Sequence, residues 1–543
     1  MSQITCRLLS SLEKVFADTV PQGEEYVRGS LLQNEQFSFQ LAVKPEQEAA
    51  VKLKVASPVG DSLRVFRVEN VPCGTASYQG YEDDDYLRKE KGMYPDLLRE
   101  YGGEAVRLSA EWSAFWFLAE PQGKWEPGLY PVEIQLLDTA GKCLTEAVFT
   151  LEILAAELPE QTLIHTEWLY TDCLAQQYRT KMFSERFWEM LEQYLRTAAR
   201  FGMNMVYTPV VTSTLSSKAG LIRPETQLVE VFIEDGGYRF DFSNLDRFIG
   251  LAQRCGIRYF EICHLFSQWG AAYPAQVSGW ENGEKKLLFG FDTPAADPRY
   301  REFLSVFLPA LTGFLEKKGL KDRCYFHVSD EPNLDQLPAY SAAAEMVRAN
   351  LPGNYKMMDA LSDFDFYAAG AVQVPVPSND HLEPFLAAEL PERWTYYCCA
   401  QGIGVSNRFI TMPSYRNRVL GLQLYKYRFD GFLHWGYNYW QDLNSARPID
   451  PFAVTDVEGY FPSGDAFLVY PGEDGPLLSI RMLVLMEGLQ DMRALQLLEV
   501  RAGREKAMEL LNRYDPDLRF TSYPRSAEKL LALREAINAE LAK

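Results

Sequence analysis

The stretch CYFHVSDEPN, residues 324–333, is the most informative in the chain. A short apolar run ends there directly in Asp330, Glu331 and Pro332. Charged side chains rarely stand so close to a buried strand unless something uses them. In a barrel of alternating strands and helices, the active site forms at the carboxyl ends of the strands. Such a barrel requires further strands and helices on both sides of this stretch.

Eight stretches between residues 163 and 437 have the composition of buried strands, and amphipathic segments separate them. The strands are predicted at 163–170, 204–209, 258–264, 324–329, 355–360, 372–376, 393–399 and 431–437. Several of the intervening segments end in glycine, as helix C-caps do. This alternation predicts a (β/α)8 TIM barrel. The connection between the fifth and sixth strands is the shortest one.

The first part of the chain is predicted to be β-structure instead. QFSFQLAVK (36–44) and VKLKVAS (51–57) alternate apolar and polar residues with a period of two, which is typical of half-buried strands. Further strands are expected at 128–138 and 147–156, and a long loop at 81–100. We therefore expect a multidomain α and β protein. An N-terminal β-sandwich (1–157) would precede a TIM barrel (158–543) that C-terminal helices close.

Composition excludes several classes of partner. The 543 residues include 54 Lys and Arg against 74 Asp and Glu, a net charge of −20. Nucleic acids and anionic membranes require a basic surface, so neither is expected as a partner. No apolar run is long enough to predict a membrane span, and the N-terminal MSQITCRLLSSLEKVF does not resemble a signal peptide. We expect a cytoplasmic protein.

The nine cysteines include no C-x-x-C motif, which favours reduced thiols and argues against a zinc site. No pair of histidines has the spacing of metal ligands on one helix, and no stretch resembles a calcium loop. We therefore expect no metal and no cofactor.

Large aromatic residues lie at or just beyond the ends of the predicted strands. Four of the five histidines lie within these strands. Aromatic rings beside carboxylates are typical of carbohydrate sites, because the C–H faces of a sugar pack on them. The alternative is that these rings belong to an ordinary barrel rim. They are Trp168, Tyr170, Trp269, Tyr397, Trp435, Tyr437 and Trp440.

Asp330 and Glu331 are the candidate catalytic pair. Pro332 is expected to hold Glu331 in an extended conformation, so that the two carboxyl groups reach the barrel mouth by different routes. Neighbouring carboxyl groups push their pKa values apart, which leaves one as an acid and one ionised, as glycoside hydrolysis requires. The alternative is structural, with Ser329, Asp330 or Asn333 capping the next helix.

At these residues the chain resembles glycoside hydrolase family 123, the retaining β-N-acetylgalactosaminidases and their relatives. HVSDEP is similar to the Asp-Glu catalytic signature of the family. GMYPDLL (92–98) resembles a loop of its sandwich domain, and GFLHWGYNYW (431–440) resembles its last barrel strand. GDAFLVYPGEDGPLLSIRMLVLMEGLQD (464–491) is similar to its closing block. The resemblance follows the same order along nearly the whole chain.

The resemblance implies substrate-assisted catalysis on a glycan that carries a 2-acetamido sugar. The acetamido oxygen would attack the anomeric carbon, Asp330 would orient the acetamido group, and Glu331 would act as general acid and then base. Trp435 is the predicted floor under the sugar. The further predicted substrate-binding residues are Tyr437 and Tyr397 as hydrogen-bonding walls, and His264, Trp168 and Asn438 as additional contacts.

Two other interpretations stay open. In the first, Glu331 is the acid of a retaining glycosidase that uses Glu261, Asp359 or Asp172 as a protein nucleophile. In the second, the chain binds carbohydrate without catalysis. The sequence leaves open the galacto or gluco preference, the linkage, exo or endo action, and the oligomeric state, for which a homodimer is one option.

Overall fold

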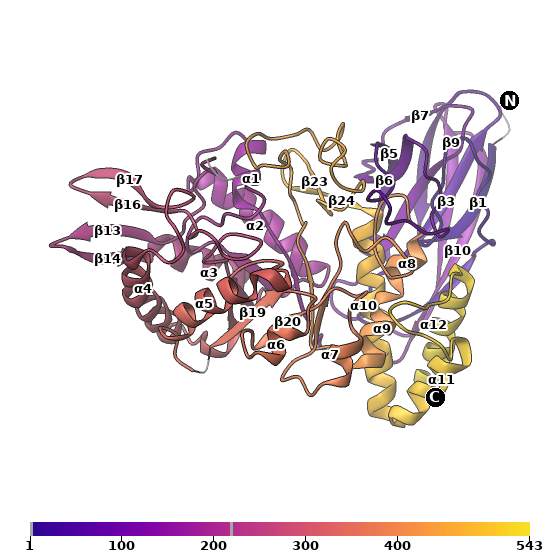
Figure 1. Ribbon diagram of the computed structural model, residues 1–543. Coiled ribbons are helices and arrows are strands. Elements are labelled where there is room, and N and C mark those ends of the chain that lie inside the picture. The colour runs from indigo at the N-terminus through magenta and orange to yellow at the C-terminus, as the bar shows by residue number, and fades with distance from the viewer. Residues whose placement is uncertain (1–3, 218–220, 354) are drawn as a thin grey trace.

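The computed structural model describes residues 4–217, 221–353 and 355–543. It contains an N-terminal β-rich region and a parallel barrel surrounded by helices, with the last helices beside the β-rich region (Figure 1). Among the helices of the described residues, none is long and apolar enough to cross a bilayer.

Eight parallel strands form the barrel, in the order β20-β19-β18-β15-β12-β11-β22-β21. Along the chain they are β11 (Ile164–Glu167), β12 (Met205–Thr208), β15 (Tyr259–Ile262), β18 (Cys324–Phe326), β19 (Lys356–Ala360), β20 (Val374–Val376), β21 (Trp394–Tyr396) and β22 (Gly431–His434). The first and last of these, β11 and β22, pair with each other. Only one parallel bridge, Ser378 to Tyr396, spans the seam between β20 and β21. The barrel is therefore nearly closed, and all eight strand predictions are confirmed.

Helices connect the barrel strands. They are α1 (Thr171–Gln177), α2 (Glu185–Arg200), α3 (Ser243–Arg254), α4 (Pro298–Lys317), α5 (Leu337–Arg348), α6 (Asp365–Ala368), α7 (Glu383–Ala387), α8 (Ser414–Arg418) and α9 (Leu420–Tyr427). Ser184 caps α2 by accepting a hydrogen bond from the backbone N–H of Phe187. The short connection between the fifth and sixth strands contains only the single-turn helix α6.

Two hairpins extend the loops that follow β12 and β15. They are β13 (Glu230–Glu234) with β14 (Gly237–Asp241), and β16 (Val277–Glu281) with β17 (Glu284–Phe289). Together they form a four-stranded sheet that projects from the end of the barrel farthest from the β-rich region (Figure 1).

The N-terminal region consists of two sheets that share one hydrophobic core. The larger sheet has the order β1-β3-β8-β5-β6-β24-β23 and the smaller one β2-β10-β9-β4-β7. Phe39 on β3 joins them, because its ring stacks on Phe117 of the same sheet and on Phe149 of the other sheet, with centroids 3.9 Å apart in the second pair. The bounds are β1 (Ile4–Ser10), β2 (Arg28–Leu32), β3 (Phe37–Pro45), β4 (Ala49–Ala56), β5 (Leu63–Cys73), β6 (Gly92–Glu100), β7 (Val106–Leu108), β8 (Ser113–Ala119), β9 (Gly128–Asp138) and β10 (Cys143–Leu154).

The predicted loop at 81–100 is wrong for its second half, because Gly92–Glu100 is strand β6. Pro95 and Asp96 made this stretch look like a loop, but both are accommodated at a β-bulge. The pairing with β5 skips Asp96, since Leu97 faces Glu69 and Pro95 faces Asn70. The extra residue Asp96 is buried.

Two short strands, β23 (Tyr470–Pro471) and β24 (Pro476–Ser479), precede the predicted closing helices. β24 pairs with β6 and so adds the end of the barrel region to the N-terminal sheet. The helices α10 (Ile480–Ala502), α11 (Arg504–Tyr514) and α12 (Ala527–Leu541) follow.

The closing block from residue 464 to 491 is mostly structural. Ser479 caps α10, and Arg481 binds the bulge carboxylate of Asp96 through two hydrogen bonds of 2.9 Å. Glu487 and Asp491 both bind Arg418 of α8. These buried ion pairs join the barrel, the last helices and the N-terminal sheet.

Candidate active site

Asp330 and Glu331 lie just beyond β18, at the carboxyl end of the barrel. The backbone N–H of Glu331 donates to the carbonyl of Ala360 at the end of β19. Its φ is +44°, in the left-handed region, although Pro332 follows. The predicted extended conformation of Glu331 is therefore wrong. A non-glycine residue held in this region is strained, and such strain concentrates at functional sites.

The side chain of Asp330 is buried and hydrogen-bonded to the loop that follows β15. Gln268 donates its amide N–H to Oδ2 of Asp330 at 2.7 Å. The backbone N–H of Trp269 donates to the Asp330 carbonyl at 2.9 Å. Burial and the nearby Glu331 raise the pKa of Asp330 well above its usual range, against the opposing effects of Gln268 and His327.

The carboxyl group of Glu331 points to a different strand. The hydroxyl of Tyr396, at the end of β21, donates to Oε1 of Glu331 at 2.7 Å. Burial raises the pKa of Glu331, the Tyr396 hydrogen bond opposes that rise, and Asp465 adds to it. Tyr396 and Gln268 were both missed by sequence reasoning. The aromatic pair at 396–397 was noted only for Tyr397, although neighbours on a strand point to opposite faces.

His327 lies on the same strand segment as Asp330 and bridges two buried carboxylates. Its Nε2 is 2.7 Å from Oε1 of Glu261, and its Nδ1 is 2.8 Å from Oδ1 of Asp359. Burial alone would lower the pKa of His327, but the hydrogen bonds to Asp359 and Glu261 outweigh it and raise the pKa to about 9. The imidazole is therefore a cation at neutral pH, and its charge favours the ionised form of Asp330.

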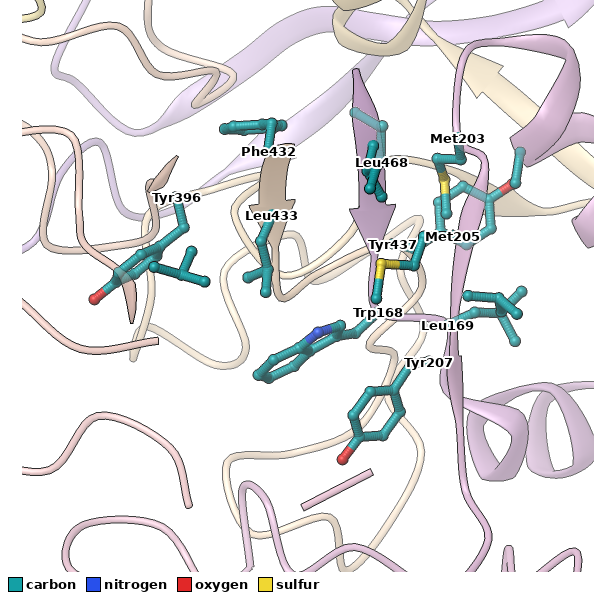
Figure 2. Close-up of a cluster of buried hydrophobic side chains, with 14 of the residues drawn as sticks. Trp168, Leu169, Met203, Met205, Tyr207, Tyr396, Phe432, Leu433, Tyr437 and Leu468 are labelled. Atoms are coloured by element: carbon teal, nitrogen blue, oxygen red, sulfur yellow. The ribbon is translucent and has the colours of Figure 1, made fainter. Parts of the chain in front are cut away.

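The two carboxylates that flank His327 are fully engaged elsewhere as well. Glu261 also accepts hydrogen bonds from the hydroxyl of Thr166 and, at 2.7 Å, from the indole N–H of Trp168. Asp359 accepts from the hydroxyl of Tyr340 and from the backbone N–H of Val328. Trp168 lies beside Tyr207, with ring centroids 5.3 Å apart (Figure 2). Trp168, a predicted substrate contact, therefore helps to hold Glu261 in place.

His264, another predicted contact, stacks on His327 with ring centroids 4.2 Å apart. Its Nδ1 is 3.0 Å from the hydroxyl of Tyr207. Its buried Nε2 has no hydrogen-bond partner among the residues that the structure describes. Burial and the charge of His327 lower the pKa of His264 well below its usual range, so the ring is neutral. An Nε2 of this kind is free to bind a polar ligand group.

The side chains of His264, His327 and Asp359 could offer a metal ion three ligand atoms, since these atoms lie within 4.8 Å of one another. Both nitrogens of His327 already bind carboxylates, however. A metal ion would have to replace the Asp359 hydrogen bond and compete with the proton on His327.

Trp435, the predicted floor of the sugar site, follows β22 and is half-buried. Its indole N–H donates to Oδ2 of Asp465 at 3.0 Å, and its ring packs against Tyr439 and Phe461. Oδ1 of Asp465 is 3.5 Å from Nε2 of His434. Asp465 therefore connects Trp435 with the surroundings of Glu331, whose pKa it raises. Sequence reasoning did not single out this aspartate.

The other three predicted contacts are fully buried. Tyr437 is fully buried and donates its hydroxyl to the carbonyl of Tyr194 in α2. Asn438 accepts from the backbone N–H of Tyr170 and donates to its carbonyl. Tyr397 is buried between Phe432 and His434, and among the described residues its hydroxyl has no hydrogen-bond partner. Figure 2 shows Tyr437 well apart from Tyr396 within the same cluster.

Two more buried carboxylates near the barrel mouth are bound to arginine. Arg223 donates to both oxygens of Asp172, the shorter hydrogen bond being 2.8 Å. Arg408 binds both oxygens of Glu167 at 2.5 Å. Bidentate guanidinium pairs of this kind hold a carboxylate in one orientation.

Comparison with known proteins agrees with this geometry. Residues 168–498 match the family model of the catalytic domain of glycoside hydrolase 123. The fold is similar to that in a study of glycolipid glycan hydrolysis by a family 123 glycoside hydrolase from Clostridium perfringens, with a TM-score of 0.73, 15% identity, and coverage of 99% of this chain and 97% of that one. A β-glucuronidase from Ruminococcus gnavus matches with a TM-score of 0.33 and 7% identity, over 83% of this chain and 65% of that one. The curated proteins contain no match.

The family match covers more than half of the chain and includes the strand end at Asp330 and Glu331. The fold comparison extends over almost its whole length. The chain belongs to glycoside hydrolase family 123 and is a glycosidase that acts on glycans.

Proposed function

We propose that the enzyme releases N-acetylgalactosamine from glycans by a retaining, substrate-assisted mechanism of the β-N-acetylhexosaminidase type. Asp330 orients the 2-acetamido group and Glu331 is the general acid and base. The proposal includes a β-sandwich over residues 1–157 and a (β/α)8 catalytic barrel over residues 158–543. Its cytoplasmic location and a homodimer remain predictions.

The observation that carries the proposal is the divergence of the two adjacent carboxyl groups. Asp330 accepts from Gln268 in the loop after β15, whereas Glu331 accepts from Tyr396 on β21. The neighbouring backbone positions thus serve two separate sides of the barrel mouth. Substrate assistance needs this separation, because the acetamido group and the leaving oxygen lie on different sides of the anomeric carbon.

In the first step, Asp330 accepts a hydrogen bond from the acetamido N–H, and the acetamido oxygen forms a bond to the anomeric carbon. The bond from that carbon to the leaving oxygen breaks, and Glu331 gives its proton to the leaving oxygen. In the second step, Glu331 removes a proton from water, whose oxygen attacks the anomeric carbon. The bond to the acetamido oxygen then breaks, and the β configuration is retained.

The raised pKa of Glu331 suits its role as the general acid. A Glu331 that keeps its proton to a higher pH than usual can act as an acid near neutrality. Burial and Glu331 raise the pKa of Asp330, and the cationic His327 opposes that rise. It thereby favours the ionised carboxylate that has to stabilise the positive charge of the cyclic intermediate.

The surroundings of the other carboxylates support a mechanism without a protein nucleophile. Glu261 and Asp359 each accept from three groups or more, and Asp172 is bound to Arg223. A carboxylate held in this way is a poor nucleophile, because attack requires it to give up these hydrogen bonds.

One observation favours the second candidate, a retaining glycosidase with a protein nucleophile. Among the described residues, Oδ1 of Asp465 has only the 3.5 Å contact with His434, and Asp465 acts electrostatically on Glu331. In that mechanism Asp465 would attack the anomeric carbon directly, and sugars without a 2-acetamido group would be substrates.

The experiment compares p-nitrophenyl β-N-acetylgalactosaminide, β-N-acetylglucosaminide and β-galactoside with the wild type, Asp330→Asn and Glu331→Gln. Asp335→Asn is the matched control, since Asp335 is an exposed carboxylate close by in the chain. We expect turnover of an acetamido sugar alone, lost by about 10²-fold or more in both site variants and kept in the control. Equal turnover of the plain galactoside, lost in Asp465→Asn, would establish the second candidate instead.

A further inference from the structure

We propose that Tyr78 and Tyr81, from the N-terminal region, form an aromatic platform for the sugar unit on the leaving-group side of the scissile bond. This inference rests on the proposed role of Glu331 as the general acid. It assigns the N-terminal region a direct part in choosing the glycan.

The connection between β5 and β6 lies over the barrel loops that carry the catalytic side. The backbone N–H of Ser463 donates to the carbonyl of Thr75 at 2.8 Å. The hydroxyl of Thr411 donates to the carbonyl of Ala76 at 2.8 Å, and Leu87 N–H donates to the Thr411 carbonyl at 2.9 Å. These barrel residues follow β21 and β22, so the connection is attached at the carboxyl ends of the strands.

A buried ion pair holds the middle of the same connection. Asp83 accepts from Arg416 at 2.9 and 3.0 Å and from the backbone N–H of Gly404 at 2.5 Å. Tyr86 donates its hydroxyl to the carbonyl of Gly402 at 3.0 Å. A Cβ atom at Gly402 would lie only 1.9 Å from the carbonyl oxygen of Tyr81, so the two backbones are in close contact. The connection is therefore a fixed wall of the barrel.

The rings of Tyr78 and Tyr81 stay open to solvent on this fixed wall. Tyr78 is 40% exposed and Tyr81 47% exposed. Their ring centroids are 6.0 Å apart at an interplanar angle of 65°, and the two residues form an antiparallel β-bridge. Two exposed rings held in one orientation form a binding surface at little entropic cost.

Tyr78 lies on the Glu331 side of the barrel mouth. The carbonyl of Tyr81 is in close contact with the backbone of Gly402, which lies in the loop that follows β21, and Ala76 accepts a hydrogen bond from Thr411 of the same loop. Tyr396, the last residue of β21, binds Glu331 directly. Glu331 protonates the leaving oxygen, so the sugar unit beyond that oxygen extends from this side.

A sugar is the occupant that fits this surface. Exposed rings present flat apolar faces on which the C–H face of a pyranose packs. The chain has a net charge of −20, and Glu82, Asp83 and Asp84 follow Tyr81 directly, so an anionic ligand is disfavoured. A neutral hexose linked to the released sugar offers such a C–H face and carries no negative charge.

The test uses two substrates that share the acetamido sugar and differ in the leaving group. β-N-acetylgalactosaminyl fluoride has no sugar on the leaving side, whereas the β-N-acetylgalactosaminyl-galactose disaccharide has one. For the Tyr78→Ala/Tyr81→Ala double variant we expect kcat/KM to fall about tenfold on the disaccharide and to stay unchanged on the fluoride. Tyr78→Phe/Tyr81→Phe keeps the rings and should keep the disaccharide activity. Leu129→Ala, which removes an exposed apolar side chain from β9, is the matched control.

An equal fall on both substrates would overturn the platform in favour of a structural role, and no fall on either would overturn it outright. If the wild type hydrolyses neither substrate, the proposed function itself has failed. Calorimetric titration with the disaccharide then tests the platform alone. Binding that is weaker in the double alanine variant than in the wild type supports it, and equal binding overturns it.

Discussion

The hydroxyl of Tyr396 donates a 2.7 Å hydrogen bond to Oε1 of Glu331, a residue 65 positions earlier in the chain. The hydrogen bond comes from the end of one barrel strand to a backbone position with a left-handed φ at the end of another. It fixes the orientation of the proposed acid and opposes the effect of burial on the pKa of Glu331.

Tyr396→Phe should raise the pKa of Glu331, because the lost hydrogen bond favours the ionised carboxylate. We expect the alkaline limb of the pH profile of kcat/KM to move to higher pH and kcat to fall about tenfold. Tyr460→Phe is the matched control, since Tyr460 is an exposed tyrosine. If the alkaline limb does not move in Tyr396→Phe, the hydrogen bond from Tyr396 does not influence the pKa of the general acid.

Asp330→Asn should stabilise the fold while it removes activity. The pKa of Asp330 is raised by burial and by Glu331. The folded state therefore keeps this proton to a higher pH than the unfolded chain does, and the free energy of unfolding of the wild type falls as the pH rises through the raised pKa. The amide lacks this titration. The stability gained over the wild type should grow as the pH rises above the usual range of a carboxyl group and reach about 0.5–2 kcal/mol, as measured by urea unfolding. A gain in stability that does not depend on pH would contradict a raised pKa for Asp330 in the folded state.

His327 should be doubly protonated at neutral pH and lose its proton only near its raised pKa of about 9. His264 should be neutral over the same range, because burial and His327 lower its pKa. The chain has five histidines, so ¹⁵N NMR of histidine-labelled protein can follow each ring, with His327→Gln for assignment. A His327 ring with one unprotonated nitrogen at pH 7 would remove the cation from beneath Asp330.

Asp96→Ala should destabilise the whole molecule, because it leaves the buried guanidinium of Arg481 without a counter-charge. We expect a loss of about 3–5 kcal/mol in the free energy of unfolding. The control is Asp18→Ala, which breaks the exposed ion pair with Arg88 and should change stability little. If the two variants lose similar amounts, the Asp96–Arg481 pair does not join the N-terminal sheet to α10.

Much of the fold could be predicted because its signal is local. The apolar run 431–437 predicts a strand from its own composition, without knowledge of the strands it pairs with. The same holds for the other seven strands of the barrel. Strand β6 was missed because Pro95 and Asp96 are turn-forming residues in isolation. Only the bulge opposite Glu69 and Asn70, and the distant Arg481, make a strand acceptable there.

Some residues of the candidate site could likewise be predicted from a local pattern, and others could not. Asp330 and Glu331 stand out in the sequence because two carboxyl groups follow a buried strand without a gap. Tyr397 was chosen in place of Tyr396 because side chains alternate across a strand, and no local pattern says which of the two faces the site. Tyr437 and Asn438 look equally suitable at the end of β22, but α2 and the backbone of Tyr170 engage them.

The sequence by itself determined the eight barrel strands, the adjacent carboxyl groups of Asp330 and Glu331 at the end of one of them, and the resemblance to the family, since each depends on residue types at short spacing. Tertiary structure alone decided which side chains hold Asp330 and Glu331, and it placed residues 74–91 beside the barrel mouth. Hydrogen bonds such as the one from Tyr396 to Glu331 join residues far apart in the chain. Their geometry is set by packing across the whole barrel, so no short stretch of sequence can specify it.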